Sequence, residues 1–426
     1  MRLSPHEIPL TITVDVSQTR DIVTLPFFLP TTAVRVDWKL IEGPPAPYVI
    51  DLGLKDPTRV RGWSGGTRTE GTLTLTSATP GYLPGSFPAG SWCLLLGLYR
   101  LPPGTTRIRV IVTWFEFVPQ WLRGDLHTHT EHSDGVWTVR ELLQQAAVTG
   151  LDFVATTDHN TASQNLVTWQ DPTSPVIRIP GMEWTTYSGH ANILGLDDPL
   201  PDWRVNQTED VIRLTDQLKK AGALVSVNHP YDEFQPGLRW DWGDDGIDLI
   251  EVWNGPWRPS NQAALDHWQE RLGLGSQVVA IGGSDTHGPS DIVQLGTPTT
   301  WVWTESPSIS GILQSIAAGH LYITQDPKGP TLSMQAGRFH VGDRVDCQNP
   351  DIVIELGLIE VGDRIRLINE SGIEYETLAV SDTWSHTIIA QGQHFIRLEV
   401  HRYRDVWQHW LPLLISNPIY LGGSSS

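Results

Sequence analysis

The fold is decided by the stretch Gly124-Asp125-Leu126-His127-Thr128-His129, which follows a change of pattern near residue 121. Side chains alternate along a strand, so His127 and His129 lie on the same face of it. A neutral imidazole is the side-chain group that most often binds a metal ion. The stretch therefore predicts a strand whose end presents two metal ligands side by side.

Around this stretch, short strand-like runs alternate with helical segments from about residue 121 to 325. Thr138 and Glu141 form a Thr-x-x-Glu capping box, and Gly150 follows the last turn of the helix that they begin. A second helix, followed by Gly222, is indicated by apolar residues at helical spacing: Val211, Leu214, Leu218 and Ala221. Strand-like runs cover residues 153–156, 223–227, 247–252 and 278–281. This alternation predicts parallel βα units, in which functional groups gather at the carboxyl ends of the strands.

More metal-capable side chains follow the successive strand ends of this segment. They are Asp134, His159, Glu183, His190, His229, Asp285 and His287. A single histidine at a strand end is more often a hydrogen-bonded structural residue than a ligand. Six of the 15 histidines, however, lie at strand ends in this one segment. Scattered surface or core histidines would not follow strand ends in this way, so the joint pattern predicts a metal centre.

The flanking segments have a different pattern. Residues 1–118 show short apolar–polar alternations separated by Pro and Gly clusters, which predicts a small β-sandwich. A β pattern returns after about residue 326, as in residues 351–355 and 364–368. We therefore expect an N-terminal β-sandwich (1–118), an α/β domain that carries the metal centre (119–325), a C-terminal β-sandwich domain (326–421) and a flexible tail (422–426).

Composition excludes several classes of protein. The net charge of −19 opposes binding to a nucleic-acid polymer or to an anionic membrane surface. No apolar run reaches the roughly 20 residues that cross a bilayer. The first residues lack the pattern of a signal peptide, which gives the expectation of a cytoplasmic protein. With only Cys93 and Cys347, a cysteine-based zinc site would lack ligands.

These motifs resemble the polymerase and histidinol phosphatase (PHP) family, and the resemblance covers about residues 121–325. It implies a distorted (β/α)7 barrel and a trinuclear metal centre, with none of the nine ligand positions substituted. One ion would be held by His127, His129, Glu183 and Asp285. Glu183 would bridge to a second ion held by His190 and His229. A third ion would be held by Asp134, His159 and His287.

The flanks are similar to the carbaryl-hydrolase-like (CehA/McbA) branch of this family. The similar motifs are Gly62-Trp63-Ser64-Gly65-Gly66, residues 78–85, Glu251-Val252-Trp253-Asn254 and residues 416–421. Few members of that branch are characterised, so the resemblance says little about the substrate.

The ligand set suits metal-dependent hydrolysis. Nitrogen and carboxylate ligands without cysteine suit Zn²⁺, Mn²⁺ or Fe²⁺, so two or three such ions are expected. A carboxylate such as Glu183 can bridge two ions about 3.5–4 Å apart, and a hydroxide held between them would be the nucleophile. A third cation would neutralise charge on a substrate with several anionic oxygens.

The remaining candidate residues are less determined by sequence. His132 and Asp158 are candidates for the general acid or for partners that orient a ligand, and Asp158 could also cap a turn. The candidates for substrate contact are Arg239, Arg258, Trp253 and Asn254. A solvated surface position explains each arginine equally well. Core packing explains Trp253 equally well.

Three functions fit this pattern. The leading hypothesis is a phosphoesterase that acts on small phosphate esters. The alternative is a hydrolase of carbamates, amides or carboxyl esters, because a metal-activated water also attacks carbonyl carbons. A non-catalytic, metal-stabilised module is the third hypothesis. The oligomeric state is not encoded in the pattern.

Overall fold

The structure is a computed structural model that describes the chain except for residues 168–175, 201, 244–245, 348 and 423–426. The described residues form two compact units, the first built mainly from Met1–Gln120 and the second from the chain after Trp121. The domain limits expected at residues 118 and 325 stay predictions. The expected tail lies outside the described residues apart from Gly422.

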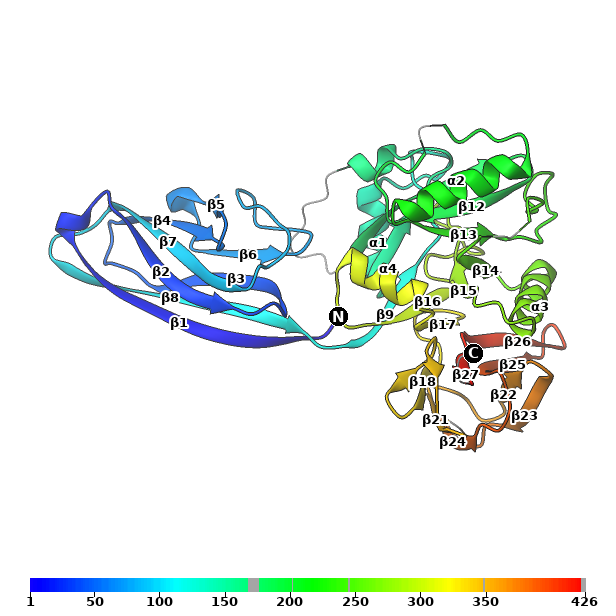
Figure 1. Cartoon of the computed structure of the whole chain (residues 1–426). Helices are drawn as coiled ribbons and strands as arrows, with labels where there is room; N and C mark the ends of the chain where they lie inside the picture. Colours follow the sequence, from blue (N-terminus) through cyan, green and yellow to red (C-terminus); the bar gives the residue numbers. More distant parts are fainter. Residues whose placement is uncertain (168–175, 201, 244–245, 348, 423–426) are drawn as a thin grey trace. The chain divides into compact units, whose positions relative to one another are not determined.

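The first unit consists of two antiparallel four-stranded sheets, with the strand orders β1-β8-β3-β6 and β2-β7-β4-β5 (Figure 1). The alternation expected from the sequence is present. In β8, for example, Ile108, Val110 and Val112 are buried at every second position. The core between the sheets includes the fully buried Trp38 and Trp92. The strands are β1 (Leu3–Asp15), β2 (Ile22–Leu29), β3 (Ala33–Glu42), β4 (Val49–Lys55), β5 (Val60–Trp63), β6 (Glu70–Thr74), β7 (Gly90–Arg100) and β8 (Thr105–Phe117).

The second unit begins with seven strands that are neighbours in one sheet, in the order β15-β14-β13-β12-β11-β10-β9. Their runs are nearly continuously apolar and buried, as expected for strands covered on both faces. The strands are β9 (Gln120–Asp125), β10 (Phe153–Thr156), β11 (Ile177–Thr186), β12 (Gly189–Leu194), β13 (Leu224–Asn228), β14 (Leu249–Asn254) and β15 (Val279–Gly283). The four runs predicted from the sequence correspond to β10, β13, β14 and β15.

Two helices of the second unit lie where the sequence predicts them. Helix α1 (Val139–Thr149) has the capping box of Thr138 and Glu141, and Gly150 follows it in the left-handed conformation. Helix α2 (Thr208–Lys220) buries Val211, Leu214 and Leu218. Helices α3 (Pro259–Gly273) and α4 (Ile309–Ala317) complete the set in the described part of the chain. Among the described residues, every helix is too short or too polar to cross a lipid bilayer.

The expected parallel order is interrupted at one strand. Pairing is parallel for β9–β10, β10–β11, β13–β14 and β14–β15, but β12 runs antiparallel to both β11 and β13. The reason is local, because Thr186 and Gly189 close a tight hairpin that leaves no room for a crossover helix. The mixed α/β class is therefore confirmed, while a (β/α)7 barrel is not shown by the regular strand pairing.

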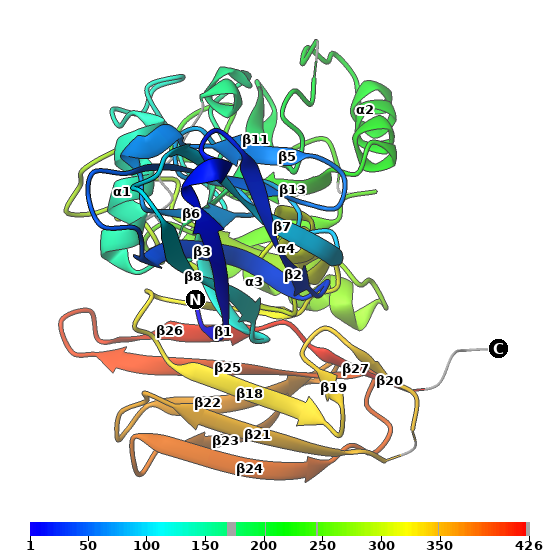
Figure 2. The same ribbon diagram turned by 90° about the vertical axis from the view of Figure 1, so that its left-hand side faces the viewer.

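The strands that follow extend this sheet and add a second one. β16 (Thr299–Thr304) neighbours β9, and the order continues through β17 (Leu321–Thr324) to β26, β25, β22 and β23. A separate four-stranded sheet has the order β19-β18-β21-β24 (Figure 2). An apolar core fills this strand-rich region. The further strands are β18 (Thr331–Ala336), β19 (Phe339–His340), β20 (Arg344–Val345), β21 (Asp351–Gly357), β22 (Arg364–Asn369), β23 (Gly372–Leu378), β24 (Thr383–Ile389), β25 (Phe395–Arg404), β26 (His409–Ser416) and β27 (Ile419–Leu421).

The capping box of α1 leads to a stability prediction. The Thr138 hydroxyl accepts a hydrogen bond from Glu141 N, and a Thr138→Ala substitution removes it. We expect Thr138→Ala to lower the free energy of unfolding by about 1 kcal/mol, measured by denaturant unfolding. Val148→Ala, at an exposed position of the same helix, is the control and should cost little. An equal loss in both variants would contradict the role of the cap.

Candidate metal centre

The nine ligands expected from the sequence all come from one edge of the seven strands. His127 and His129 follow β9, His159 follows β10, and His229 follows β13. The reversal of β12 explains the position of His190, because the start of an antiparallel strand lies at the same edge as the ends of its neighbours. His190 accordingly pairs with Asn228, directly beside His229. The hairpin thus keeps His190 in the centre.

The structure brings these nine side chains together. They form four groups, within each of which the ligand atoms lie within 4.8 Å of one another. Among the described residues these groups contain the nine expected side chains and no others. The groups are His129, Asp134, His159 and His287; His127, His129 and Asp285; His127, Glu183 and His229; and His159, Glu183 and His190.

Glu183 is the centre of the arrangement. Its Oε1 lies 3.2 Å from His127 Nε2, 3.3 Å from His190 Nδ1 and 3.4 Å from His229 Nε2. Its Oε2 lies 2.7 Å from His159 Nδ1 and 3.5 Å from His129 Nε2. The Glu183 side chain is fully buried. Each of its oxygens therefore faces a different set of imidazoles, as a bridging carboxylate requires.

The donor atoms fit divalent cations. Five buried atoms have no hydrogen-bond partner among the described residues: His127 Nε2, His129 Nε2, Glu183 Oε2, His190 Nδ1 and His229 Nδ1. A buried polar atom without a partner costs about 1–3 kcal/mol, so five in one place need a common explanation. Four of them, all but His229 Nδ1, lie within 3.5 Å of another expected ligand atom, and metal coordination would satisfy these four together. His229 faces Glu183 with its other ring nitrogen, Nε2.

The charges of the carboxylates support the same conclusion. Burial raises the pKa of Glu183, but His127 and the other imidazoles lower it well below its usual range. Burial likewise raises the pKa of Asp285, and His127 and His129 outweigh that effect. Hydrogen bonds to His159 and His287 lower the pKa of Asp134. Burial lowers the pKa of His127, His159 and His287, but the same carboxylates outweigh it and raise the pKa of these imidazoles. The three ionised carboxylates therefore pair with protonated imidazoles in the absence of metal, and a bound cation would replace those protons.

The backbone is strained at three places in the centre. Asn160, His229 and Asp285 have φ angles of 49°, 30° and 56°, in the left-handed region that non-glycine residues rarely adopt. Such strain costs on the order of 1–3 kcal/mol per residue and persists where the surroundings impose it. Two of the three residues are expected metal ligands, so the local conformation serves the site.

A set of buried partners orients the ligands, and sequence reasoning missed most of it. His127 Nδ1 lies 3.0 Å from Glu251 Oε1, and His159 Nδ1 lies 2.6 Å from Thr185 Oγ1. Asn228 Nδ2 donates to Glu183 Oε1 at 2.9 Å. Glu251 lies in the middle of β14, so the rule that located the other ligands beside strand ends does not single it out.

The two candidates for the general acid, Asp158 and His132, have different surroundings. Asp158 is fully buried and accepts hydrogen bonds from Thr130 N, Thr130 Oγ1 and Ser133 Oγ. This indicates that it fixes the loop that carries Asp134, rather than reaching a substrate. His132 Nδ1 lies 2.8 Å from Ser163 Oγ, and His132 belongs to none of the four groups.

Two of the expected substrate contacts are engaged elsewhere. Trp253 is 2% exposed, and its indole N–H donates to Gly255 O, so core packing explains it. Arg239 forms ion pairs with Glu233 at 2.8 Å and Asp241 at 3.4 Å, which offset its charge. Trp253 is therefore unavailable to a substrate, whereas the side chain of Arg239 is 51% exposed within its surface ion pairs.

Arg258 and Asn254, in contrast, lie beside the metal ligands. Asn254 Nδ2 donates to Asp285 Oδ2 at 3.4 Å, and Arg258 Nη2 donates to Asn254 Oδ1 at 2.5 Å. Asp232 Oδ2 lies 3.0 Å from the same Arg258 nitrogen. Arg258 Nε has no hydrogen-bond partner among the described residues. The guanidinium is therefore anchored by one edge beside the centre.

The centre is closed on one side and open on the other. The side chains of His127, His129 and Glu183 are about 1% exposed or less, whereas those of Asp134 and His287 are 60% and 40% exposed. At the open side, Val136 N donates to His287 O, which places the two chain segments side by side.

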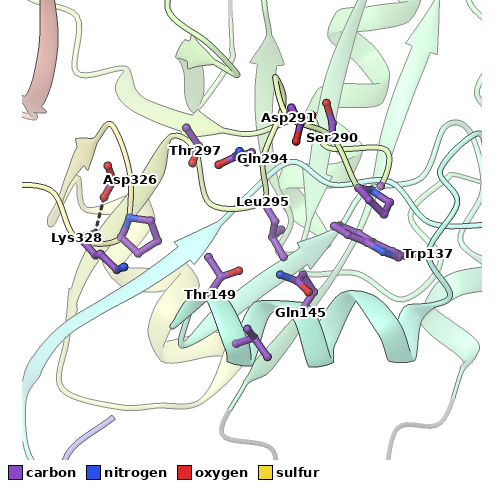
Figure 3. Close-up of a pocket in the computed structure, with 14 residues that line it drawn as sticks. Trp137, Gln145, Thr149, Ser290, Asp291, Gln294, Leu295, Thr297, Asp326 and Lys328 are labelled. Carbon is purple, nitrogen blue, oxygen red and sulfur yellow. Dashed lines mark hydrogen bonds between the residues drawn. The ribbon is translucent and has the colours of Figure 1, made fainter.

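A cavity of about 1040 Å³ lies beside the segments that carry Asp134 and His287, and none of the nine expected ligands is among its lining residues (Figure 3). Its lining includes Gly288, which directly follows His287, and Trp137, which follows Asp134 by three residues. Figure 3 shows Trp137 at one end of the cavity and Asp326 and Lys328 at the other, with Gln145 and Thr149 on helix α1 between them. The lining is largely polar, so the cavity suits a polar organic group.

Comparisons with known proteins give limited matches. No family model matches the chain. An uncharacterized protein of Methanocaldococcus jannaschii is 29% identical over 145 residues, which cover 31% of this chain and 82% of that protein. A two-domain protein of Bacteroides vulgatus, which contains a predicted PHP-like metal-dependent phosphoesterase, aligns with a TM-score of 0.40 at 18% identity. That alignment covers 69% of this chain and 96% of the other.

Two further solved structures align over shorter parts. A Bifidobacterium adolescentis protein, proposed to be a metal-dependent phosphoesterase, has a TM-score of 0.29 and 18% identity over 41% of this chain and 90% of its own. An amidohydrolase of Chromobacterium violaceum has a TM-score of 0.27 and 15% identity over 40% of this chain and 90% of its own. All three TM-scores lie below 0.5, so the metal centre is inferred from its own geometry.

The buried unpartnered atoms lead to a prediction on metal binding. Adding Zn²⁺ or Mn²⁺ to chelator-treated protein should stabilise the second unit, by about 2.7 kcal/mol when the free metal is 100 times its Kd. Glu183→Gln should abolish most of this effect, because Glu183 belongs to two of the four groups. Thermal unfolding and metal analysis measure both. Glu131→Gln, at an exposed position, is the control. Unchanged metal content in Glu183→Gln would contradict the bridging position.

Proposed function

We propose that the chain is a metal-dependent phosphoesterase of the PHP family that acts on small anionic phosphate esters. The observation that carries the proposal is the convergence of nine ionisable side chains around the buried, ionised Glu183. Divalent cations bound there, with Zn²⁺, Mn²⁺ and Fe²⁺ as candidates, would activate water and neutralise charge on the substrate. The carbaryl-hydrolase-like branch stays a prediction.

In this proposal His127, His129 and Asp285 hold one ion, Glu183 bridges to a second with His190 and His229, and a third lies among Asp134, His159 and His287. The third group is the most exposed of the three, so an incoming substrate meets it first. Phosphate esters have several anionic oxygens that benefit from a cation there, whereas a carbonyl substrate has one. The exposure of this group therefore favours phosphate over carbonyl chemistry.

The chain supplies further groups for the substrate. The anchored guanidinium of Arg258 is the cation beside the centre, and its role is to hold a phosphate oxygen. The cavity lined by Trp137 is the place for the organic part of the ester. His132 remains the candidate for protonating the leaving group.

We further propose that strands β9–β15 form the distorted seven-stranded barrel of this family. The support comes from residues just beyond the first and last of these strands. Thr128 and Thr286 form an isolated parallel bridge, with hydrogen bonds from His129 N to Thr286 O and from Asp285 N to His127 O, each 2.9 Å long. These bonds join the two ends of the seven-strand run at the metal centre itself.

The experiment that tests the function is a substrate panel of phosphate mono-, di- and triesters alongside carbamates and carboxyl esters. His159→Ala should reduce turnover of phosphate esters by about 10²–10³, the typical cost of one lost oxyanion contact. Carbamate or carboxyl ester turnover should fall much less. Wild type and variant are compared at matched metal content. Efficient cleavage of carbamates by the wild type, without any cleavage of phosphate esters, would replace the proposal by the carbonyl hydrolase.

The cavity gives a separate prediction on substrate size. Trp137→Ala should raise KM two- to tenfold for phosphate esters with a ring in the alcohol part, since an aromatic contact contributes about 0.5–1.5 kcal/mol. The kcat of these esters and the KM of methyl phosphate should hardly change. Trp407→Ala is the matched control, because Trp407 is exposed and lies outside the cavity. Equal effects on large and small esters would exclude the cavity as the binding place.

A further inference from the structure

Glu251 is a buried carboxylate that belongs to none of the four metal-capable groups. It lies in β14, is 1% exposed, and places its two oxygens on two different expected ligands. Oε1 lies 3.0 Å from His127 Nδ1, and Oε2 accepts a hydrogen bond from His229 N at 2.9 Å. Its contacts therefore reach both neighbouring ion positions of the proposed centre.

The contact with His127 determines which ring nitrogen is available to a metal. When Nδ1 carries the proton and donates it to Glu251 Oε1, Nε2 is left with a free lone pair. That Nε2 lies 3.2 Å from Glu183 Oε1 and 3.3 Å from Asp285 Oδ1, and it has no hydrogen-bond partner among the described residues. Glu251 thus holds the ring in the tautomer and orientation that face the centre.

The contact with His229 acts on the backbone. His229 has a φ of 30°, a strained conformation that directs its side chain toward Glu183. The hydrogen bond from His229 N to Glu251 Oε2 stabilises that conformation. The same oxygen accepts a hydrogen bond from Asn254 Nδ2 at 3.1 Å, and this amide also contacts the ligand Asp285.

The space around Glu251 is closely filled. A Cβ atom at Gly283 would lie 2.8 Å from Glu251 Oε1 and 2.4 Å from His127 Cβ, so glycine is needed where β15 passes this pair. Glu251 therefore has little freedom to move away from its partners.

We propose that Glu251 is a positioning residue that sets the ligand geometry of two neighbouring ion positions at once. The inference rests on the proposed metal centre but not on the choice of substrate. Glu251→Gln replaces one acceptor oxygen by an NH₂ donor. In either orientation of the amide, that donor faces an N–H group: the ring N–H of His127, or the N–H groups of His229 and Asn254. The His127 ring can avoid the clash only by moving its proton to Nε2, which blocks the ligand atom.

The test is metal affinity, measured without any substrate. Zn²⁺ and Co²⁺ are titrated into chelator-treated wild type, Glu251→Gln and Asp152→Asn, with a chelator competitor and with the visible spectrum of Co²⁺ as a second signal. Glu251→Gln should lose about 10- to 100-fold in affinity at two ions per chain, as is typical when the partner of a metal-bound histidine is removed. Asp152→Asn is the matched control, because Asp152 is also a buried carboxylate that accepts a backbone N–H, from Arg123.

A second measurement on the wild type keeps the test decisive if Glu251→Gln does not fold. NMR of the zinc-loaded protein with ¹⁵N-labelled histidine should show His127 protonated at Nδ1 and coordinated through Nε2, with its signals identified by their loss in His127→Asn.

The outcomes separate the inference from the proposed function. Wild-type affinity in Glu251→Gln, or coordination of His127 through Nδ1, overturns the role of Glu251 and leaves the metal centre standing. Failure of the wild type to bind either metal overturns the metal centre and the inference together.

Discussion

The second unit is organised around one electrostatic constraint, the burial of the ionised Glu183 carboxylate. Removing a carboxylate from water costs several kcal/mol unless opposite charges and hydrogen bonds compensate it. Five imidazoles lie within 3.5 Å of this carboxylate, three on one oxygen and two on the other, and cations held between them and the carboxylate would supply the compensation. The imidazoles belong to segments that follow or begin different strands. The strands must therefore end at a common edge, and the ligand loops must turn inward there.

Several irregular features follow from that constraint. A regular parallel strand in place of β12 would carry His190 to the opposite edge, so the hairpin between β11 and β12 is what brings it to Glu183. The left-handed backbone at His229 and Asp285 has the same origin. In an extended chain consecutive side chains point to opposite faces, so Asn228 and His229 could not both reach Glu183. Local backbone strain is offset by the favourable interactions of the centre as a whole.

The sequence predicts those parts that depend on local periodicity. The capping box of Thr138 and the apolar spacing of α2 locate two helices, because both signals lie within one or two turns of chain. The nine expected ligands are predicted from their positions beside strand ends, and the structure brings all nine side chains together. Periodicity does not contain the direction of a strand in its sheet or the hydrogen-bond partners of a side chain. It gives no sign that β12 is reversed, that the oxygens of Asp158 are used by Thr130 and Ser133, or that Trp253 packs in the core. Glu251 shows the limit best: it lies on a predicted strand, but its partners, His127 and His229, are set by the fold.

Long-range hydrogen bonding also explains why the C-terminal strands share a compact unit with the metal centre. β26 pairs with β17, so residues about ninety positions apart in sequence continue one sheet. Asn417 is 1% exposed, and its side chain accepts from Ala280 N at 2.9 Å and donates to Ala280 O at 2.8 Å. These two bonds complete the backbone hydrogen bonding of β15 at a position where a further strand would otherwise be needed. Because β15 leads into Asp285 and His287, the placement of these two expected ligands depends on the side-chain amide of Asn417. The β pattern that returns near residue 326 predicts where the strand-rich segment begins, whereas the extent of the structural unit is set by such long-range hydrogen bonds.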